Sequence, residues 1–210
     1  IEVVWFNGGQ IQSPELQQNS EELKQLLDYS YSVVLEGYLK FANVFKIGRT
    51  INPFECTKMD VLLFGQEAGF LIPDTLFTEN KSDLNNFYEK HSKKGIISKR
   101  ISDQTHFYEK NKVYNLVNTF EVNAELINNI PNTFGLSQFQ ERIERQYEIR
   151  VVYLLGKCYA MAVFTSEIVD YRINLNKNEE IRMVPYNLGL DDEHKLTLLM
   201  EKLNLNYGSV

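Results

Sequence analysis

The chain has 210 residues and a formal net charge of −6; 43% of its residues are hydrophobic and 12% aromatic. This makeup can bury a core, which excludes a disordered tail, and the acidic balance argues against general nucleic-acid binding. No apolar run approaches the roughly 18 residues of a membrane span, and no signal peptide is visible. We therefore expect a cytoplasmic protein that binds neither nucleic acid nor a membrane.

The chain opens with a β-rich segment over 1–6 that ends at the turn signal Asn7-Gly8-Gly9. Asn19 and Glu22 then form a capping-box pattern. Behind it, apolar residues at helical spacing predict a long amphipathic helix that reaches Tyr38.

A second helix is predicted over 58–68, because its apolar residues lie on one side and Gly69 supplies a stop. The segment 72–78 predicts an edge strand, since Pro73 lacks a backbone donor. The pattern then predicts one short helix and three strands, in the order 84–88, 96–99, 113–119 and 134–143.

The clearest hairpin signal lies at 148–164, where two apolar strands flank Gly156-Lys157, a pair that suits a two-residue turn. A last helix is predicted around Leu196 and Leu203. Helices and strands are mixed, and antiparallel signals dominate the second half. The predicted class is α+β, in several lobes.

Familiar catalytic motifs are missing from the sequence. It has no GxxxxGK[ST] phosphate loop, no HExxH and no GxSxG. Its three histidines are scattered among polar neighbours, where surface roles are commoner than catalytic ones. Cys56 and Cys158 lack CxxC spacing and are predicted to be reduced thiols, not zinc ligands.

Charged residues embedded in strands are the unusual feature. Lys99 ends an otherwise apolar strand, Glu148 and Arg150 share one face at spacing two, and Asp170 and Arg172 repeat that spacing. Such charges are costly inside a sheet unless they are paired or liganded. Two interpretations stay open: the acid-x-arginine pairs satisfy each other on an exposed face, or they join Lys99 in a polyphosphate pocket.

The order of motifs resembles the ATP-grasp enzymes, in the branch of the ribosomal-protein glutamate ligase. More closely, the chain is similar to the graspetide synthetases, peptide maturases of the grasp-with-spasm and microviridin type. The motifs that carry this resemblance are, in chain order, Thr57-Lys58, Ala68-Gly69, Leu71-Ile72-Pro73-Asp74-Thr75, Ile97-Ser98-Lys99, Phe139-Gln140-Glu141-Arg142-Ile143, Glu148-Ile149-Arg150-Val151, Ala160-Met161-Ala162-Val163-Phe164, Asp170-Tyr171-Arg172, Met183-Val184-Pro185-Tyr186 and the end segment from Leu203 to Val210. Each motif alone is weak, whereas the ordered set is specific.

The resemblance implies an ATP-grasp fold in which antiparallel sheets clamp ATP. It implies an N-terminal pre-ATP-grasp lobe over 1–75, a central lobe over 76–137 and a C-terminal lobe over 138–210. The family's magnesium ligands follow the Gly-Ser-Val segment, which ends here at Val210. The C-terminal lobe is therefore expected to be incomplete, and no metal ligand is assigned.

For the nucleotide, the resemblance implies phosphate contacts, an adenine hinge and a ribose ligand. Lys58 and Lys99 are expected to contact the phosphates, and Glu148 is expected to bind the ribose. Gln140, Glu141 and the backbone near Ile143 are expected to form the adenine hinge. Arg150 is expected next to the phosphates. Asp170 and Arg172, assisted by Asn174, are expected to hold the acidic side chain of a substrate peptide.

The implied activity is ATP-dependent ligation with ATP and Mg²⁺ as cofactors. An Asp or Glu carboxylate of a ribosomally made precursor peptide, leader plus core, is phosphorylated and then attacked by Thr, Ser or Lys to give an ester or amide crosslink. A homodimer is left open. Two other interpretations also stay open: a non-catalytic ATP-grasp-like module that binds nucleotide or peptide, and an unrelated α+β domain with structural charge pairs.

Overall fold

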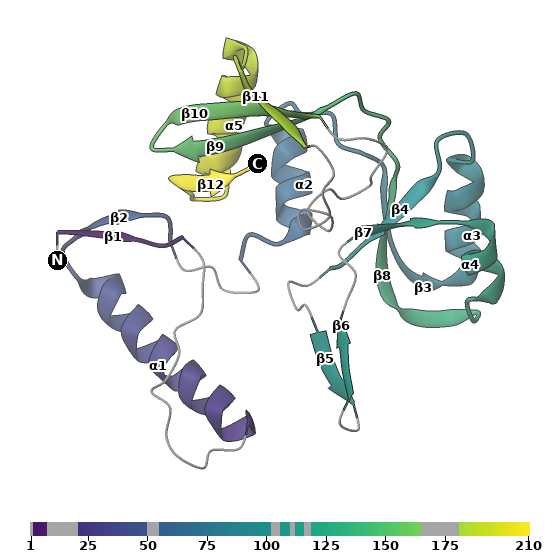
Figure 1. Ribbon diagram of the computed structural model, residues 1–210, viewed down its shortest axis with the longest axis horizontal. Helices are drawn as coiled ribbons and strands as arrows, with labels where there is room; N and C mark the ends of the chain where they lie inside the picture. The colour runs from purple at the N-terminus through teal and green to yellow at the C-terminus, as the bar shows by residue number, and fades with distance from the viewer. Residues whose placement is uncertain are drawn as a thin grey trace.

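A computed structural model describes residues 2–7, 21–49, 55–101, 106–109, 112–115, 119–164 and 181–210. It contains helices and mainly antiparallel sheets (Figure 1), which confirms the α+β class. Within these ranges, no helix combines the length and apolar character needed to cross a bilayer.

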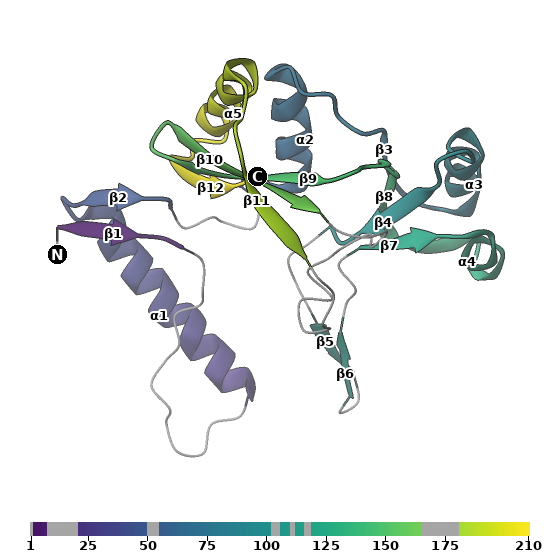
Figure 2. The ribbon, with the colours of Figure 1, turned by 45° about the horizontal axis from the view of Figure 1, so that its top comes forward.

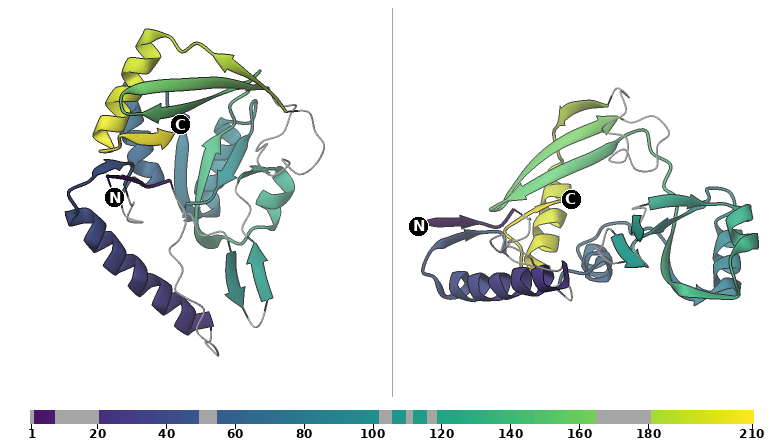
Figure 3. Two further views of the ribbon diagram at one scale, coloured as in Figure 1. Left: turned by 60° about the vertical axis from the view of Figure 1, so that its left-hand side comes forward. Right: turned by 60° about the horizontal axis from the view of Figure 1, so that its bottom comes forward.

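The N-terminal unit consists of two parallel strands and the long helix between them. β1 (Val3–Trp5) pairs with β2 (Phe45–Ile47), and α1 (Glu21–Phe41) confirms the predicted long helix. In both views of Figure 3, α1 lies at the edge of the molecule beside these strands. The unit is held by the far end of the chain, because the Asn206 side chain accepts a hydrogen bond from the Gly48 backbone at 2.7 Å.

The central sheet is antiparallel, with the strand order β3-β8-β4-β7. Its strands are β3 (Thr75–Asn80), β4 (Ile96–Lys99), β7 (Thr119–Val122) and β8 (Thr133–Glu141). The edge position predicted for the Pro73 segment is confirmed by β3, and the strand predicted at 96–99 is confirmed by β4.

Two helices cover one face of this sheet, and we call the opposite face, which neither of them covers, the helix-free face. α3 (Lys81–Lys90) and α4 (Ala124–Asn129) lie on the side away from the C-terminal sheet (Figure 1 and Figure 2). The core between helices and sheet is apolar, and its buried members are Leu84, Phe87, Ile96, Val122, Ile127 and Phe139. The opposite face is thus available for a site.

A small hairpin of β5 (His106–Glu109) and β6 (Lys112–Asn115) extends away from both larger sheets in Figure 2. The single strand predicted over 113–119 is wrong, because β6 and β7 belong to different sheets. Both strands are rich in β-forming residues, so composition alone does not show where β6 ends and β7 begins.

The C-terminal sheet is also antiparallel, with the order β11-β10-β9-β12. Its strands are β9 (Glu148–Leu154), β10 (Lys157–Phe164), β11 (Arg182–Tyr186) and β12 (Tyr207–Ser209). Two helices, α2 (Lys58–Glu67) and α5 (Leu190–Lys202), pack on each other through Ala68, Leu199 and Leu203. The helix predicted near Leu196 is confirmed by α5.

The predicted hairpin at 148–164 is confirmed, but its turn lies one residue earlier than expected. Leu154 pairs with Lys157, so the turn residues are Leu155 and Gly156, both with positive φ, 49° and 84°. Positive φ at both positions is the signature of a type I′ turn, which normally selects Asn-Gly. Leu155 is apolar and was therefore counted with the strand.

The lobe boundaries expected after residues 75 and 137 fall inside β3 and β8, two neighbouring strands of the central sheet. The bounds of the three lobes stay a prediction. The chain then leaves β8 and enters the C-terminal sheet at Glu148.

Candidate nucleotide site

The helix-free face of the central sheet carries buried polar side chains. Side chains alternate along a strand, and Phe139 of β8 points into the core under α3 and α4. Gln138 and Gln140, its neighbours on either side, therefore point to the helix-free face. They are only 2% and 4% exposed. Amides buried to this degree require hydrogen-bond partners.

One of these amides joins a chain of contacts across three strands. Lys99 Nζ donates to Gln140 Oε1 at 2.8 Å, and Gln140 Nε2 donates to Thr75 Oγ1 at 2.9 Å. Thr75 Oγ1 in turn donates to the Pro73 carbonyl at 2.8 Å. The lysine at the end of β4 is thereby held against β8, with its ammonium group on the helix-free face.

Gln138 lies opposite Lys99 in the strand register. Its side-chain oxygen is buried and accepts no hydrogen bond within the described part of the chain. A buried acceptor without a donor costs free energy, and a bound ligand with N–H or O–H groups would remove that cost. The face therefore offers both a cation and an acceptor, which fits a nucleotide better than an apolar ligand.

Lys58 reaches the same end of β4 from α2. Thr57 caps this helix, and Asp60 completes a capping box with it, which fixes Lys58 in the first turn. Its ammonium group donates to the Arg100 carbonyl, directly after Lys99 in the chain. The two lysines predicted to contact phosphate thus both lie at the end of β4.

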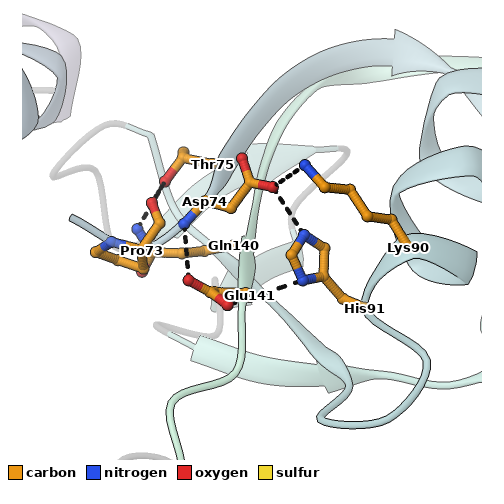
Figure 4. A network of polar contacts seen from close by, with 7 residues as sticks. All are labelled: Pro73, Asp74, Thr75, Lys90, His91, Gln140 and Glu141. Carbon is orange, nitrogen blue, oxygen red and sulfur yellow. Dashed lines mark hydrogen bonds and ion pairs between the residues drawn. The ribbon is translucent and has the colours of Figure 1, made fainter. Parts of the chain in front are cut away.

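Glu141 behaves differently from the prediction that it forms the adenine hinge together with Gln140. Its carboxylate accepts from the Asp74 backbone N–H at 3.1 Å and lies 3.8 Å from His91 Nδ1, as Figure 4 shows. Because adjacent side chains in a strand point to opposite faces, this carboxylate lies on the side of Phe139 and away from Lys99. Only the backbone of Glu141 is left for the predicted role.

Asp74 is the centre of these contacts. Lys90 Nζ and His91 Nε2 lie 2.5 Å and 2.8 Å from its Oδ2 atom. The hydrogen bond from Lys90, followed by that from His91, holds the pKa of the Asp74 carboxyl below its usual range. This carboxylate therefore stays ionised and keeps both partners.

The remaining predicted residues lie elsewhere. Ile143 is exposed in the segment between the two sheets. Glu148 and Arg150 lie in β9, on one face, opposite Val163 and Met161 of β10, and Glu148 accepts from Arg145 at 2.7 Å. Asp170, Arg172 and Asn174 lie outside the described residues.

The structure thus joins Lys99 and Gln140 on the central sheet and brings Lys58 of α2 to the Arg100 carbonyl, one residue beyond Lys99. Within the described ranges, no group of three or more His, Cys, Asp or Glu side chains could hold a metal ion. We therefore assign no metal ligand among the described residues and derive no step from a metal.

The sequence matches no protein-family profile and no curated protein. Solved structures do match its fold. The macrocyclase MdnC of Microcystis aeruginosa MRC, bound to the precursor peptide MdnA, matches with a TM-score of 0.78 at 21% identity, over 100% of this chain and 65% of MdnC. A RiPP-associated ATP-grasp ligase of Chryseobacterium gregarium, in complex with ADP and a leader and core peptide, matches with a TM-score of 0.72 at 20% identity, over 100% of this chain and 63% of that one.

The chain has the ATP-grasp fold. A third ATP-grasp ligase, PsnB in complex with Mg, ADP and a phosphomimetic variant of its minimal precursor, matches with a TM-score of 0.67 at 16% identity, over 89% of this chain and 55% of PsnB. The chain spans less than two thirds of the length of each of these three proteins. The ATP-grasp fold expected from the resemblance is confirmed.

Proposed function

We propose that this ATP-grasp chain belongs to an ATP-dependent ligase that crosslinks a ribosomally made precursor peptide. The observation that supports the proposal most is the Lys99–Gln140–Thr75 chain on the helix-free face, together with Lys58. A fold alone does not fix a function. The Lys99 ammonium group and the buried amides on this face, with Lys58 at the residue after Lys99, supply the cations and polar groups that a triphosphate requires.

In the proposed reaction, an oxygen of an Asp or Glu carboxylate attacks the γ-phosphorus of ATP, and ADP leaves. The hydroxyl of Thr or Ser, or the amine of Lys, then attacks the acyl carbon, loses its proton and expels phosphate. The peptide loses one water for each ester or amide formed. Phosphorylation is needed because a carboxylate by itself is a poor electrophile.

The roles of the chain's own residues follow from their chemistry. Lys58 and Lys99 offset phosphate charge, and Gln140 with the backbone from Glu141 to Ile143 holds the adenine. Glu148 binds the ribose and Arg150 lies near the phosphates. Asp170 and Arg172, with Asn174, hold the acidic side chain of the peptide. Each of these assignments is part of the proposal.

The partner and the setting are also proposed. The solved structures matched by this fold include complexes with precursor peptide, with leader and core peptides, and with Mg and ADP. We propose the same kinds of ligand for this protein: a leader-plus-core peptide, ATP and Mg²⁺. We place the reaction in the cytoplasm, where such peptides are made, and leave a homodimer open.

Release of ADP by the full-length protein tests the proposal. ATP and Mg²⁺ are supplied with a peptide rich in Thr and Glu, and a matched control peptide carries Gln in place of each Glu. ADP should form only with the carboxylate peptide. Binding of ATP without ADP release would favour the non-catalytic module, and absence of ATP binding would favour an unrelated α+β domain.

A further inference from the structure

A polar network ties the end of α3 to two strands of the central sheet (Figure 4). His91 follows the last residue of α3 and lies between two carboxylates: Nε2 is 2.8 Å from Asp74 and Nδ1 is 3.8 Å from Glu141. Asp74 precedes β3, and Glu141 is the last residue of β8. The network therefore lies where the chain leaves the central sheet for the C-terminal one.

The position of the His91 ring is well defined. Its side chain is only 11% exposed, and the ring packs on Phe87 with the centroids 4.6 Å apart. A histidine this enclosed has few alternative rotamers. Its two ring nitrogens are therefore aimed at Asp74 and Glu141 by packing, and this makes the contact specific.

The same loop also binds the backbone of the strand end. Gly95, whose φ of +82° favours glycine, donates to the His91 carbonyl at 2.8 Å and accepts from the Arg142 N–H at 3.0 Å. The Glu141 N–H donates to the Asp74 carbonyl at 3.0 Å. Side-chain and backbone contacts thus hold Glu141 and Arg142 from both sides.

This arrangement determines which side chain the strand end presents to the helix-free face. With the Glu141 carboxylate retained by Asp74 N–H and His91, the preceding Gln140 must point the other way, toward Lys99. The residues after Glu141 continue into the segment assigned to adenine. A loose strand end would disturb both the Lys99–Gln140 pair and that segment.

We propose that His91, acting with Asp74 through Glu141, is a positioning residue for nucleotide binding. The inference rests on the proposed function, because it concerns the same adenine and phosphate site. His91 touches no substrate in this assignment. It reduces the freedom of the Gln140–Ile143 segment before the nucleotide binds, which lowers the ordering cost of binding.

Hydrogen exchange of the full-length protein without nucleotide tests the first half of the proposal. In His91→Phe, the ring still packs on Phe87 but loses the hydrogen bond to Asp74 and the longer polar contact with Glu141. The amides of Glu141 and Arg142 should exchange at least about threefold faster than in the wild type, and the Val151 amide in β9 should be unchanged. The matched control is His194→Phe, at an exposed histidine of α5, which should alter neither region.

ATP titration and steady-state kinetics test the second half. His91→Phe should raise both the Kd and the KM for ATP roughly three- to tenfold, as expected from one lost hydrogen bond, and leave kcat near the wild-type value. A fall in kcat alone, or an unchanged Kd despite faster exchange, would overturn the positioning role. Unchanged exchange would overturn the network itself.

Asp74→Asn provides a second variant in case His91→Phe fails to fold. It retains the shape of the side chain but removes the charge shared by Lys90 and His91. The exchange of the Glu141 and Arg142 amides and the Kd for ATP should rise as in His91→Phe, but to a smaller extent. A Kd and exchange rates equal to the wild type would count against the proposal. If the wild type binds no ATP, the proposed function falls. The exchange data would still report on the network, so the two failures are distinguishable.

Discussion

Lys99 and Gln140 form a polar pair between two strands on the helix-free face of the central sheet. Their register places one at the end of β4 and the other on β8, joined at 2.8 Å. The sequence already indicated both residues, because a lysine at the end of an apolar strand is unusual. Thr75 was missed because it lies far from Lys99 and Gln140 in the sequence. Gln138 could have been found from its spacing of two from Gln140.

Replacement of Lys99 tests the phosphate assignment. Lys99→Ala should weaken ATP binding about ten- to a hundredfold, since a charge-assisted hydrogen bond contributes about 1.5–3 kcal/mol. Calorimetry of the full-length protein measures the change. Lys93→Ala, at an exposed lysine of the same lobe, is the control and should bind like the wild type. Equal affinity of Lys99→Ala and wild type would locate the phosphates elsewhere.

Arg172 tests the peptide assignment. Because we assign its guanidinium group to the peptide carboxylate, Arg172→Ala should abolish most of the crosslinking and change the ATP affinity less than about twofold. Mass spectrometry of the peptide and calorimetry of ATP provide the two measurements. A parallel loss of crosslinking and ATP affinity would contradict the assignment.

Protonation of the Asp74 carboxylate is expected to make the protein less stable at acid pH. Its pKa in the folded protein is lowered, first by the hydrogen bond from Lys90 and then by that from His91. Its stabilising contribution is therefore fully present above its unfolded pKa of about 4 and is lost as pH falls through the lower folded value. The effect is modest, because the Asp74 and Lys90 side chains are 38% and 65% exposed.

The comparison of wild type with Asp74→Asn isolates this contribution. Urea unfolding near pH 6 and near pH 3 should show that the wild type is the more stable protein at the higher pH and that the difference shrinks at the lower pH. A difference that stays constant between the two pH values would show that the charge on Asp74 does not stabilise the fold.

At the scale of elements, the β9–β10 turn is the clearest test of backbone geometry. Gly156 has a φ of +84°, and a Cβ there would meet no atom within 4 Å. Gly156→Ala should therefore cost about 1–2 kcal/mol through the backbone alone. Gly135→Ala in β8, where a Cβ also meets nothing and no positive φ is needed, should be neutral or slightly stabilising.

Chemical denaturation of both glycine variants measures these costs. If alanine changed the free energy of unfolding equally at both positions, the positive φ at Gly156 would not explain the cost of that substitution. The variants also separate backbone strain from loss of space, because both sites are open. Neither substitution touches the proposed nucleotide site.

Local patterns predicted those elements whose signals are local. The long helix α1, the short strand β4 and the hairpin of β9 and β10 follow from periodicity, and α2 from its stop at Gly69. The turn at Leu155 was misplaced because an apolar residue occupies a position that usually takes Asn. The network of Asp74, His91 and Glu141 was not predicted, because it joins three elements that only the tertiary fold brings together.

At the scale of the whole molecule, α2 links the two larger sheets. It packs on α5 through Ala68 and Leu199, and Lys202 of α5 pairs with Glu67 at 2.7 Å. At its other end, Lys58 bonds the Arg100 carbonyl after β4 of the central sheet. One helix therefore contacts both α5 and the proposed phosphate site.

The match to the solved structures of MdnC and the Chryseobacterium ligase over 100% of the chain establishes the fold. The polar groups on the helix-free face of the central sheet support the proposed nucleotide site. The resemblance in the sequence predicted the fold correctly. The residues that we propose to bind the peptide lie in the segment 165–180, outside the described residues, so solution chemistry must test their roles.

Mass spectrometry can follow the ligation of a peptide at the expense of ATP. The full-length protein is incubated with ATP, Mg²⁺ and a precursor peptide rich in Thr and Glu or Asp, and the peptide mass is followed with time. We expect successive losses of water from the peptide, each accompanied by the formation of one ADP. A peptide whose mass stays unchanged although the protein binds both ATP and the peptide would contradict the proposed function.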